Sequence, residues 1–360
     1  MNKMTQERLL LTNRDYKDNV IIEDDDIKIT KKEIIKNIIK IICLYFIMMI
    51  LLHSSKFIYA LYVDLDQKVP QDKENNIKVA VCTMAKLENL YVEEFVEYYI
   101  KLGIDHIFIY DDNDPNTERI IDAIDNKYKS KVTTYENIKG KIKHQSDAYT
   151  NCYHTNMKEY DWFLMIDMDE FLFIVNNTLK NYLSNEIYNK CDFIKFNWAT
   201  ANDNNLVYYD SRPLLERFKP PYIKESFIKS IIRSNIPELH YWVHSPDYSP
   251  KRNVTCNSNG DLMDISNGIN IEENFNKTFS KAFIIHFRYK TTEEFIKKYK
   301  RGYSTWFGNY LDTFLSNNVR VFFEINRLSL EKINLVEREL NISLTKYKIK
   351  YYLRALFFMN

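Results

Sequence analysis

The chain has 360 residues, a formal net charge of +1 and 45% hydrophobic residues. This size and apolar content suffice for one large or two medium domains, and the near-zero charge does not favour nucleic acid as a partner. Glycine occurs 6 times, and neither GxGxxG nor GxxxxGK[ST] is present. A Rossmann dinucleotide loop and a P-loop are therefore unsupported, and a bound nucleotide would need its phosphates held by side chains and metal.

The N-terminal part predicts a membrane anchor. Residues 1–37 are predicted to be a cytosolic tail, in which residues 1–30 are polar, carry the acidic run EDDD and are typical of a poorly ordered segment. Residues 38–63 contain the apolar run IICLYFIMMILL and approach the roughly 20 apolar residues that a spanning helix needs. The lysines before this run predict that the N-terminal end stays cytosolic.

Residues 64–77 are then predicted to be a stem, and the rest of the chain would face the lumen of the secretory pathway as a single-pass type II protein. The alternative for residues 38–63 is an amphipathic or core helix of a soluble protein.

Five cysteines occur, and none stands in a CxxC pair, so a zinc ribbon or a thioredoxin-type site is disfavoured. Cys43 lies in the apolar run. The other four, Cys82, Cys152, Cys191 and Cys256, can pair in an oxidising compartment, but their spacing does not determine the connectivity.

Residues 78–173 alternate between predicted strands and helices. Strands are predicted at residues 78–84, 105–110, 131–135 and 162–166, and helices at residues 89–102, 118–126 and 146–160. Gly103 is predicted to end the first helix. Such alternation predicts an α/β fold in which a mostly parallel sheet is flanked by helices on both faces.

Polar residues stand at the ends of three of these strands: Thr83, then Asp111 and Asp112, then Asp167 and Asp169. Ligands of open parallel sheets bind at the carboxyl ends of the strands, so these side chains are expected to converge on one crevice. In a strand, alternate side chains share a face. Asp167 and Asp169 would then make a site for Mn²⁺ or Mg²⁺, and the alternative for them is an acidic surface turn.

The pattern changes after residue 173. Strands are predicted at residues 193–198, 229–233 and 282–287, residues 254–277 are predicted to be irregular, and helices follow from residue 293. The last segment, residues 347–358, is basic and aromatic and can pack on the domain or touch a membrane surface.

Three stretches together resemble glycosyltransferase family 92, which is similar to family 2. They are VAVCTMAKLENLYVEEFVEYYIKLGIDHIFIYDDND, HQSDAYTNCYHTNMKEYDWFLMIDMDEFLF and HFRYKTTEEFIKKYKRG. The resemblance implies a GT-A fold, a nucleotide-sugar donor and a divalent metal at the DxD motif. It also implies that a hexose is transferred with inversion to a glycan or glycoconjugate in a Golgi-like compartment. Members of the family are associated with the transfer of galactose from UDP-galactose. The catalytic domain is predicted at residues 78–302, with a C-terminal helical extension at residues 303–360.

The resemblance also implies roles for single residues. Asp167 and Asp169 would hold the metal and the diphosphate, and Asp111 and Asp112 match the nucleoside-binding position. His286 is the best candidate for an added metal ligand, with His244 second. The alternative for His286 is a buried histidine that is satisfied by hydrogen bonds.

Four cations, Lys229, Arg233, Lys290 and Arg301, are candidates for neutralising the remaining phosphate charge. A solvated surface cation is the alternative for each of them except Arg301, which stands in the fuller family pattern.

An inverting reaction needs a general base, for which Asp203 and Glu170 are the candidates. Family 2-like enzymes often carry a glycine where this chain has NWATANDNN, so the sequence leaves both the base and the acceptor site open. The alternative for Glu170 is that it fixes the strand end through backbone donors.

Two other functions stay open at this point. A metal-dependent nucleotidyltransferase uses the same two-carboxylate chemistry. A sugar-binding module can keep such a fold without turnover.

Overall fold

A computed structural model describes residues 35–45, 47, 59–70, 76–136, 138, 142, 144–248, 254–263, 275–301 and 311–357. The chain divides into two compact units, Met1–Tyr59 and Ala60–Asn360. In the first unit, residues 35–45 are helical and exposed. None of the helices in the described ranges is both long and apolar enough to cross a membrane. The predicted anchor falls partly outside these ranges, at residues 46 and 48–58.

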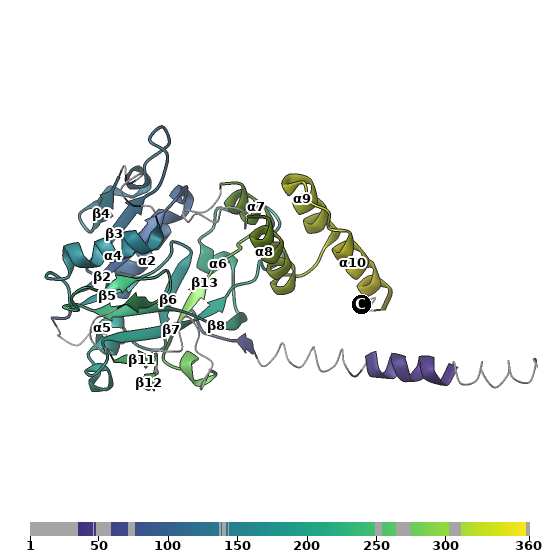
Figure 1. Ribbon diagram of the computed structural model, residues 1–360, viewed down its shortest axis with the longest axis horizontal. Coiled ribbons are helices and arrows are strands. Elements are labelled where there is room, and N and C mark those ends of the chain that lie inside the picture. Colours follow the sequence, from purple (N-terminus) through teal and green to yellow (C-terminus); the bar gives the residue numbers. More distant parts are fainter. Residues whose placement is uncertain are drawn as a thin grey trace, which may run out of the picture. The chain divides into compact units, whose positions relative to one another are not determined.

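The second unit is a mixed α/β structure around a central 11-stranded sheet, in which the described strands follow the order β12-β11-β7-β8-β5-β2-β3-β4 (Figure 1). The predicted parallel part is confirmed, because β5, β2, β3 and β4 lie side by side and run parallel. Their bounds are β2 Val79–Ala85, β3 His106–Asp111, β4 Val132–Tyr135 and β5 Trp162–Met165.

Helices cover both faces of this parallel part. On one face, α2 (Asn89–Leu102) contributes Phe95 to the core, and Gly103 ends the helix in the left-handed conformation, as predicted. On the other face, α4 (Gln145–Asn156) contributes Tyr149. Figure 1 shows α2 and α4 alongside these strands.

The predicted helix at residues 118–126 is wrong. Residues Ile120–Ala123 form a 3₁₀ turn, η1, and Asn126–Lys129 form the short helix α3. The extended backbone of Ile124 ends the first turn, and the Asp125 side chain accepts a hydrogen bond from Lys127 N and starts the second.

The other half of the sheet is mixed. Its strands are β6 Glu170–Ile174, β7 Phe193–Thr200, β8 Tyr222–Arg233, β11 Thr255–Asn257, β12 Leu262–Met263 and β13 Ala282–His286. β8 is far longer than predicted and runs antiparallel to both β5 and β7. β13 lies between β7, to which it is parallel, and β6, to which it is antiparallel. β1 (Ala60–Leu61), inside the predicted anchor range, pairs with β8.

Helices α7 to α10 share a separate core. It includes Tyr289, Phe295 of α7, Phe322 of α8, Ile333 of α9 and Tyr347 of α10. The bounds are α7 Thr292–Lys300, α8 Leu311–Ile325, α9 Leu330–Leu340 and α10 Thr345–Phe357. The remaining described elements are α5 Leu179–Leu183, η2 Glu186–Tyr188, α6 Leu214–Arg217, β9 His240–Tyr241, β10 Pro246–Tyr248 and η4 Lys277–Phe279.

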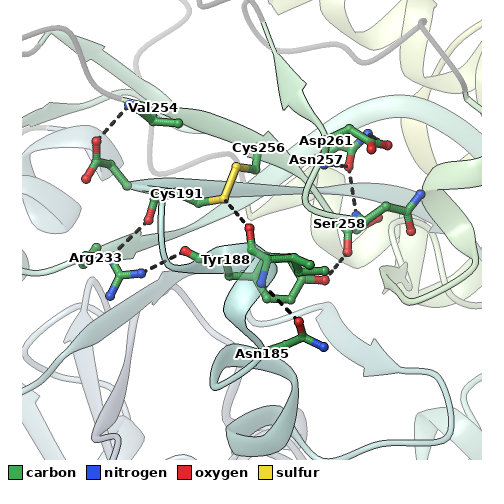
Figure 2. The surroundings of a disulfide bond; sticks show 12 residues. Asn185, Tyr188, Cys191, Arg233, Val254, Cys256, Asn257, Ser258 and Asp261 are labelled. Atoms are coloured by element: carbon green, nitrogen blue, oxygen red, sulfur yellow. Dashed lines mark hydrogen bonds between the residues drawn. A yellow bond between two sulfur atoms is a disulfide. The ribbon is translucent and has the colours of Figure 1, made fainter.

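Two disulfides resolve the connectivity that the spacing left open. Cys82–Cys152 joins β2 to α4, and Cys191–Cys256 joins the segment before β7 to β11 (Figure 2). Cys43 is a free, exposed cysteine. Both bonds close long loops, of 70 and 65 residues in sequence separation, which is the case in which a disulfide most restricts the unfolded chain.

Candidate active site

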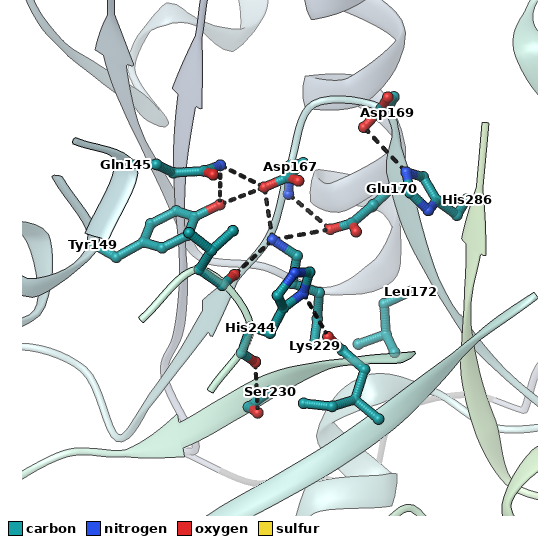
Figure 3. Close-up of polar contacts among 12 residues, drawn as sticks. Gln145, Tyr149, Asp167, Asp169, Glu170, Leu172, Lys229, Ser230, His244 and His286 are labelled. Carbon is teal, nitrogen blue, oxygen red and sulfur yellow. Dashed lines mark hydrogen bonds and ion pairs between the residues drawn. The ribbon is translucent and has the colours of Figure 1, made fainter. Parts of the chain in front are cut away.

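The two acids of the DxD motif, Asp167 and Asp169, lie in a connection between strands (the DMD connection) and not on one strand face as predicted. The apolar stretch around them is two strands, β5 and β6, joined by residues 166–169. Glu170 N donates to Asp167 O at 3.1 Å, which closes a turn. Because the backbone turns here, Asp167 and Asp169 meet different partners (Figure 3).

Asp167 is held from the side of α4 and β8. Its Oδ1 accepts hydrogen bonds from Gln145 Nε2 at 2.5 Å, Tyr149 OH at 2.7 Å and Lys229 Nζ at 2.7 Å. Burial raises the pKa of Asp167, but Lys229 outweighs it, so that the pKa is lowered overall. The Asp167 side chain is still 28% exposed, and it faces the carboxyl edge of the sheet.

Lys229 is a fully buried cation, which contradicts the surface alternative. Its Nζ lies 3.6 Å from Glu170 Oε2 and donates to Val243 O at 2.8 Å. Glu170 is also fully buried; its Oε2 accepts a hydrogen bond from Asp167 N at 2.9 Å. Burial raises the pKa of Glu170 well above its ordinary value. This geometry fits a carboxyl group that fixes the connection through a backbone donor, and it does not bring Glu170 to the surface as a base.

Asp169 faces β13 and α7. Its Oδ2 accepts from Lys298 Nζ at 2.5 Å, and its Oδ1 lies 3.7 Å from His286 Nε2. The latter contact follows from the sheet, since His286 is the ladder partner of Glu170. Burial lowers the pKa of His286 to about 3, against the opposing effect of Asp169. The imidazole is therefore neutral at physiological pH, which is the form that binds metals.

The pair Asp169–His286 fits a divalent cation. A separation of 3.7 Å between Oδ1 and Nε2 is too long for a hydrogen bond, whereas an ion about 2.1 Å from each atom fits into that gap. Within the described ranges, no three acidic, histidine or cysteine side chains form a complete cage. Mg²⁺ in phosphate-handling sites commonly takes one or two carboxylates and completes its shell with substrate phosphates and water.

A cavity of about 230 Å³ lies beside Asp169, at the carboxyl end of β2. It is lined by Leu87, Glu88, Leu90, Tyr91, Tyr289, Lys290, Glu294, Lys297, Lys298 and Arg301. Lys298 belongs to this lining and also binds Asp169. A second pocket, which includes Thr117 and Glu118 of the loop after β3, shares Leu87 and Leu90 with the first. The hollow thus extends from the side of Asp169 toward the β3 loop.

The two cations that were predicted here have specific partners. Arg301 donates to the carbonyl of Lys86 and, at 2.5 Å, to Glu88 Oε1. Lys290 is buried, and its Nζ lies 4.2 Å from the centre of the Tyr91 ring. Burial lowers the pKa of Lys290.

The strand ends converge as predicted, but their polar residues differ in exposure. Thr83 is fully buried, and its hydroxyl has no hydrogen-bond partner in the described part of the chain. Asp111 uses both carboxylate oxygens within its own loop, accepting from Asn113 N at 2.9 Å and Ile120 N at 2.8 Å. Asp112 is half-buried at the sheet edge, and its N donates to Ala85 O at 2.8 Å.

The structure does not bring Arg233 to this site. Arg233 is the ladder partner of Trp162, at the start of β5, whereas Asp167 follows the end of that strand. Its guanidinium donates to Cys191 O and Tyr188 O at 3.1 Å and 3.0 Å, beside the second disulfide (Figure 2). Because β8 is antiparallel to β5, Arg233 lies beside the start of β5 and Lys229 lies beside its end.

Asp203 is likewise engaged elsewhere. It is 2% exposed and forms an ion pair with Lys332 of α9 at 2.5 Å. Burial raises the pKa of Asp203, and Lys332 opposes the rise. The pair joins the loop after β7 to the C-terminal helices.

Three side chains of the site were not singled out from the sequence. Lys298 stands in the quoted stretch HFRYKTTEEFIKKYKRG, but nothing local separates it from the neighbouring lysines. Gln145 and Tyr149 are four residues apart on α4, a spacing that puts them on one helix face. The polar face of the helix that precedes the DMD connection could therefore have indicated these two residues from the sequence.

Comparison with known proteins identifies the family of this chain. The sequence profile of glycosyltransferase family 92 matches residues 75–319, which is more than half of the chain. A glycosyltransferase family 92 protein of Oryza sativa subsp. japonica is 31% identical over 109 residues, covering 30% of this chain and 18% of the relative. A glycosyltransferase family 92 protein of Ricinus communis is 22% identical over 239 residues, covering 65% of this chain and 39% of the relative.

The chain thus spans less than half the length of these curated relatives. The family's profile nevertheless includes β2 to β13, the DMD connection and the lysine-rich cavity. The chain belongs to glycosyltransferase family 92.

Proposed function

We propose that the protein is a metal-dependent glycosyltransferase that moves a hexose from a nucleotide-diphosphate sugar, UDP-galactose being the first donor to test, to a glycan or glycoconjugate, with inversion. The fold assignment that accompanies it is GT-A. The observation that carries the proposal is the cation-lined cavity beside Asp169 and His286 at the carboxyl edge of the parallel strands. Family membership supports glycosyl rather than nucleotidyl transfer.

The chain's residues divide the work on the donor. Asp169 and His286 would hold Mn²⁺ or Mg²⁺, and the exposed side of Asp167 would assist. When bound, the ion supplies a positive charge that stabilises the diphosphate leaving group. Lys298 and Arg301 line the cavity and would meet the remaining phosphate charge.

The nucleoside would occupy the hollow toward the β3 loop. Asp112 stands at that end of the sheet, and Asp111 shapes the loop by binding Ile120 N and Asn113 N. Ligands of parallel sheets bind where neighbouring strands end, and Asp111 is the ladder partner of Ala85 at the end of β2.

The proposed location is the lumen of the secretory pathway. The two disulfides support it, because such bonds persist in oxidising compartments. A type II anchor within residues 38–63 stays a prediction, and alkaline extraction of membranes from expressing cells tests it. Release of the full-length chain into the soluble fraction would refute the anchor.

A transfer assay tests the reaction class. Purified protein is incubated with UDP-[¹⁴C]galactose, a mixture of released glycans and MnCl₂, and the labelled product is quantified. Metal-dependent incorporation of label is expected. Pyrophosphate release from a nucleoside triphosphate without sugar transfer would favour a nucleotidyltransferase. Donor binding without turnover would favour a sugar-binding module.

A further inference from the structure

A cluster of aromatic rings leads away from His286 toward the surface. The Trp198 ring on β7 lies 4.2 Å from the His286 ring, 5.2 Å from His244 and 5.4 Å from Phe227 on β8, measured between centroids. Trp198 is 6% exposed, whereas Phe227 is 36% exposed. The cluster therefore connects a candidate metal ligand to solvent.

Strand β8 bulges where it passes Trp198. Asn197 pairs with Ile228 and Ala199 pairs with Lys224, so residues 225–227 of β8 all lie opposite Trp198. Bulges of this kind re-aim side chains and are enriched beside active sites.

The bulge is held in place by a buried amide. Asn197 is fully buried, and its Nδ2 donates to the carbonyls of Glu225 and Ser226 at 3.2 Å and 3.1 Å. Its Oδ1 accepts from Thr278 Oγ1 at 2.7 Å. Two hydrogen bonds thus fix the backbone that carries Glu225 and Phe227, and the third, from Thr278, holds the Asn197 amide in place.

Glu225 is a half-buried acidic residue at this bulge. Burial raises the pKa of Glu225, while the neighbouring Thr200 hydroxyl and the charge of Arg288 oppose the rise. Thr200 is the ladder partner of His286, and among the described residues its hydroxyl has no hydrogen bond of ordinary geometry. β8 is two strands away from β13 in the sheet, with β7 between them. The backbone of the bulge therefore lies about 10 Å from the strand that carries His286.

We propose that the β8 bulge is the acceptor site, in which Phe227 and Trp198 contact the acceptor sugar and Glu225 is the general base. This rests on the proposed glycosyl transfer. The Glu225 carboxylate takes the proton of the acceptor hydroxyl, and the hydroxyl oxygen bonds to the anomeric carbon. The bond from that carbon to the diphosphate oxygen breaks, and its electron pair leaves with the nucleoside diphosphate.

The other carboxylates near this edge suit the role less well. Asp203 is 2% exposed and bound by Lys332, and Glu170 is fully buried beneath Lys229. A base must reach the acceptor hydroxyl and must have a pKa near the working pH. Glu225 combines partial exposure with a raised pKa.

The test compares Glu225→Gln with wild type, using UDP-galactose as donor and a set of p-nitrophenyl hexosides as acceptors. The kcat is expected to fall about 10²- to 10⁴-fold, with the acidic limb of the pH–rate profile lost and UDP binding by calorimetry unchanged. Glu216→Gln, at an exposed position on α6, is the control that retains full activity.

Two further variants separate the roles. Phe227→Ala, at the exposed rim, is expected to raise the acceptor KM about tenfold, as for a lost contact of about 1.4 kcal/mol, without changing the donor KM. Asn197→Ala is expected to lower kcat while thermal unfolding remains cooperative, because it loosens the bulge.

The outcomes distinguish this proposal from the function on which it rests. If wild type transfers sugar and Glu225→Gln transfers it equally fast, the base assignment is refuted and the glycosyltransferase stands. If Phe227→Ala leaves the acceptor KM unchanged, the aromatic contact is refuted. If wild type neither binds UDP nor transfers sugar, both proposals are refuted.

Discussion

Asp167 and Asp169 stand two residues apart in the chain but in two different regions. Three donors from α4 and β8 converge on Oδ1 of Asp167, and one of them is the fully buried Lys229. Asp169 instead faces a neutral histidine on β13 and Lys298, whose side chain is 21% exposed and borders the cavity.

This contrast separates an acid that is fixed in place, Asp167, from one that can be released to a metal, Asp169. A fully buried ammonium cannot leave its carboxylate without a large desolvation cost, so Lys229 fixes Asp167 permanently. A partly exposed lysine can move into water, so Lys298 can yield Asp169 to a metal. The comparison therefore predicts that the Asp167 side governs stability and the Asp169 side governs turnover.

The largest effect is expected on the Asp167 side. Lys229→Met removes the cation and leaves Asp167 and Glu170 uncompensated, which is expected to lower the free energy of unfolding by about 3–5 kcal/mol. Chemical denaturation measures it. Lys224→Met is the control on the same strand, where the lysine is partly exposed and a change below about 1 kcal/mol is expected. Equal losses in the two variants would contradict the assignment.

On the Asp169 side, the effect is expected in turnover. Asp169→Asn keeps the shape of the side chain but removes its charge, and the transfer rate is expected to fall about 10²- to 10³-fold, as when a group that stabilises developing charge is lost. Initial rates at saturating manganese measure it, with circular dichroism as the control for folding. Wild-type activity in this variant would remove Asp169 from the site.

A smaller effect separates two neighbouring lysines. Lys298→Ala is expected to weaken donor binding about tenfold, because a charge-assisted hydrogen bond contributes about 1.5 kcal/mol. Lys300→Ala is the matched control, since its side chain is 51% exposed, pairs with Glu339 and is not part of the cavity lining. The donor KM of both variants is the measurement, and a larger change for Lys300→Ala would reverse the assignment.

The smallest effect concerns pH. The folded pKa values of Asp167 and Asp169 are lowered, since their cationic neighbours outweigh burial. An aspartate in the unfolded chain has a pKa of about 3.9. The contribution of these two carboxylates to the free energy of unfolding is therefore fully present above that pH, and it is lost as pH falls through their folded pKa values. The difference in unfolding free energy between wild type and Lys229→Met should therefore shrink below about pH 4. A constant difference down to pH 2 would contradict this coupling.

The sequence predicts the parallel half of the fold because each strand and helix there carries its own local pattern. α2 spans the predicted residues, and Gly103 ends it. The convergence of strand ends follows from parallel topology, so Asp111 and Asp167 could be placed at one edge. The prediction that His286 joins Asp169 came instead from the resemblance to family 92, and the structure places the two side chains 3.7 Å apart.

The features that could not be predicted from the sequence depend on which strands pair across the sheet and in which direction. Lys229 and Arg233 both stand on β8, but the antiparallel course of β8 puts one beneath Asp167 and the other beside Cys191. No local pattern reports that direction. The turn at residues 166–169 is hidden because apolar residues flank it on both sides, and the β8 bulge at Glu225 appears only when β7 is paired with it.

Calorimetric titration of the full chain with UDP, in the presence and absence of manganese, is the decisive experiment for the proposed donor site. We predict UDP binding that requires manganese in wild type, persists in Glu225→Gln and is lost in Asp169→Asn. Absence of UDP binding in wild type, or equal binding with and without manganese, would contradict a metal-assisted donor site at Asp169 and His286.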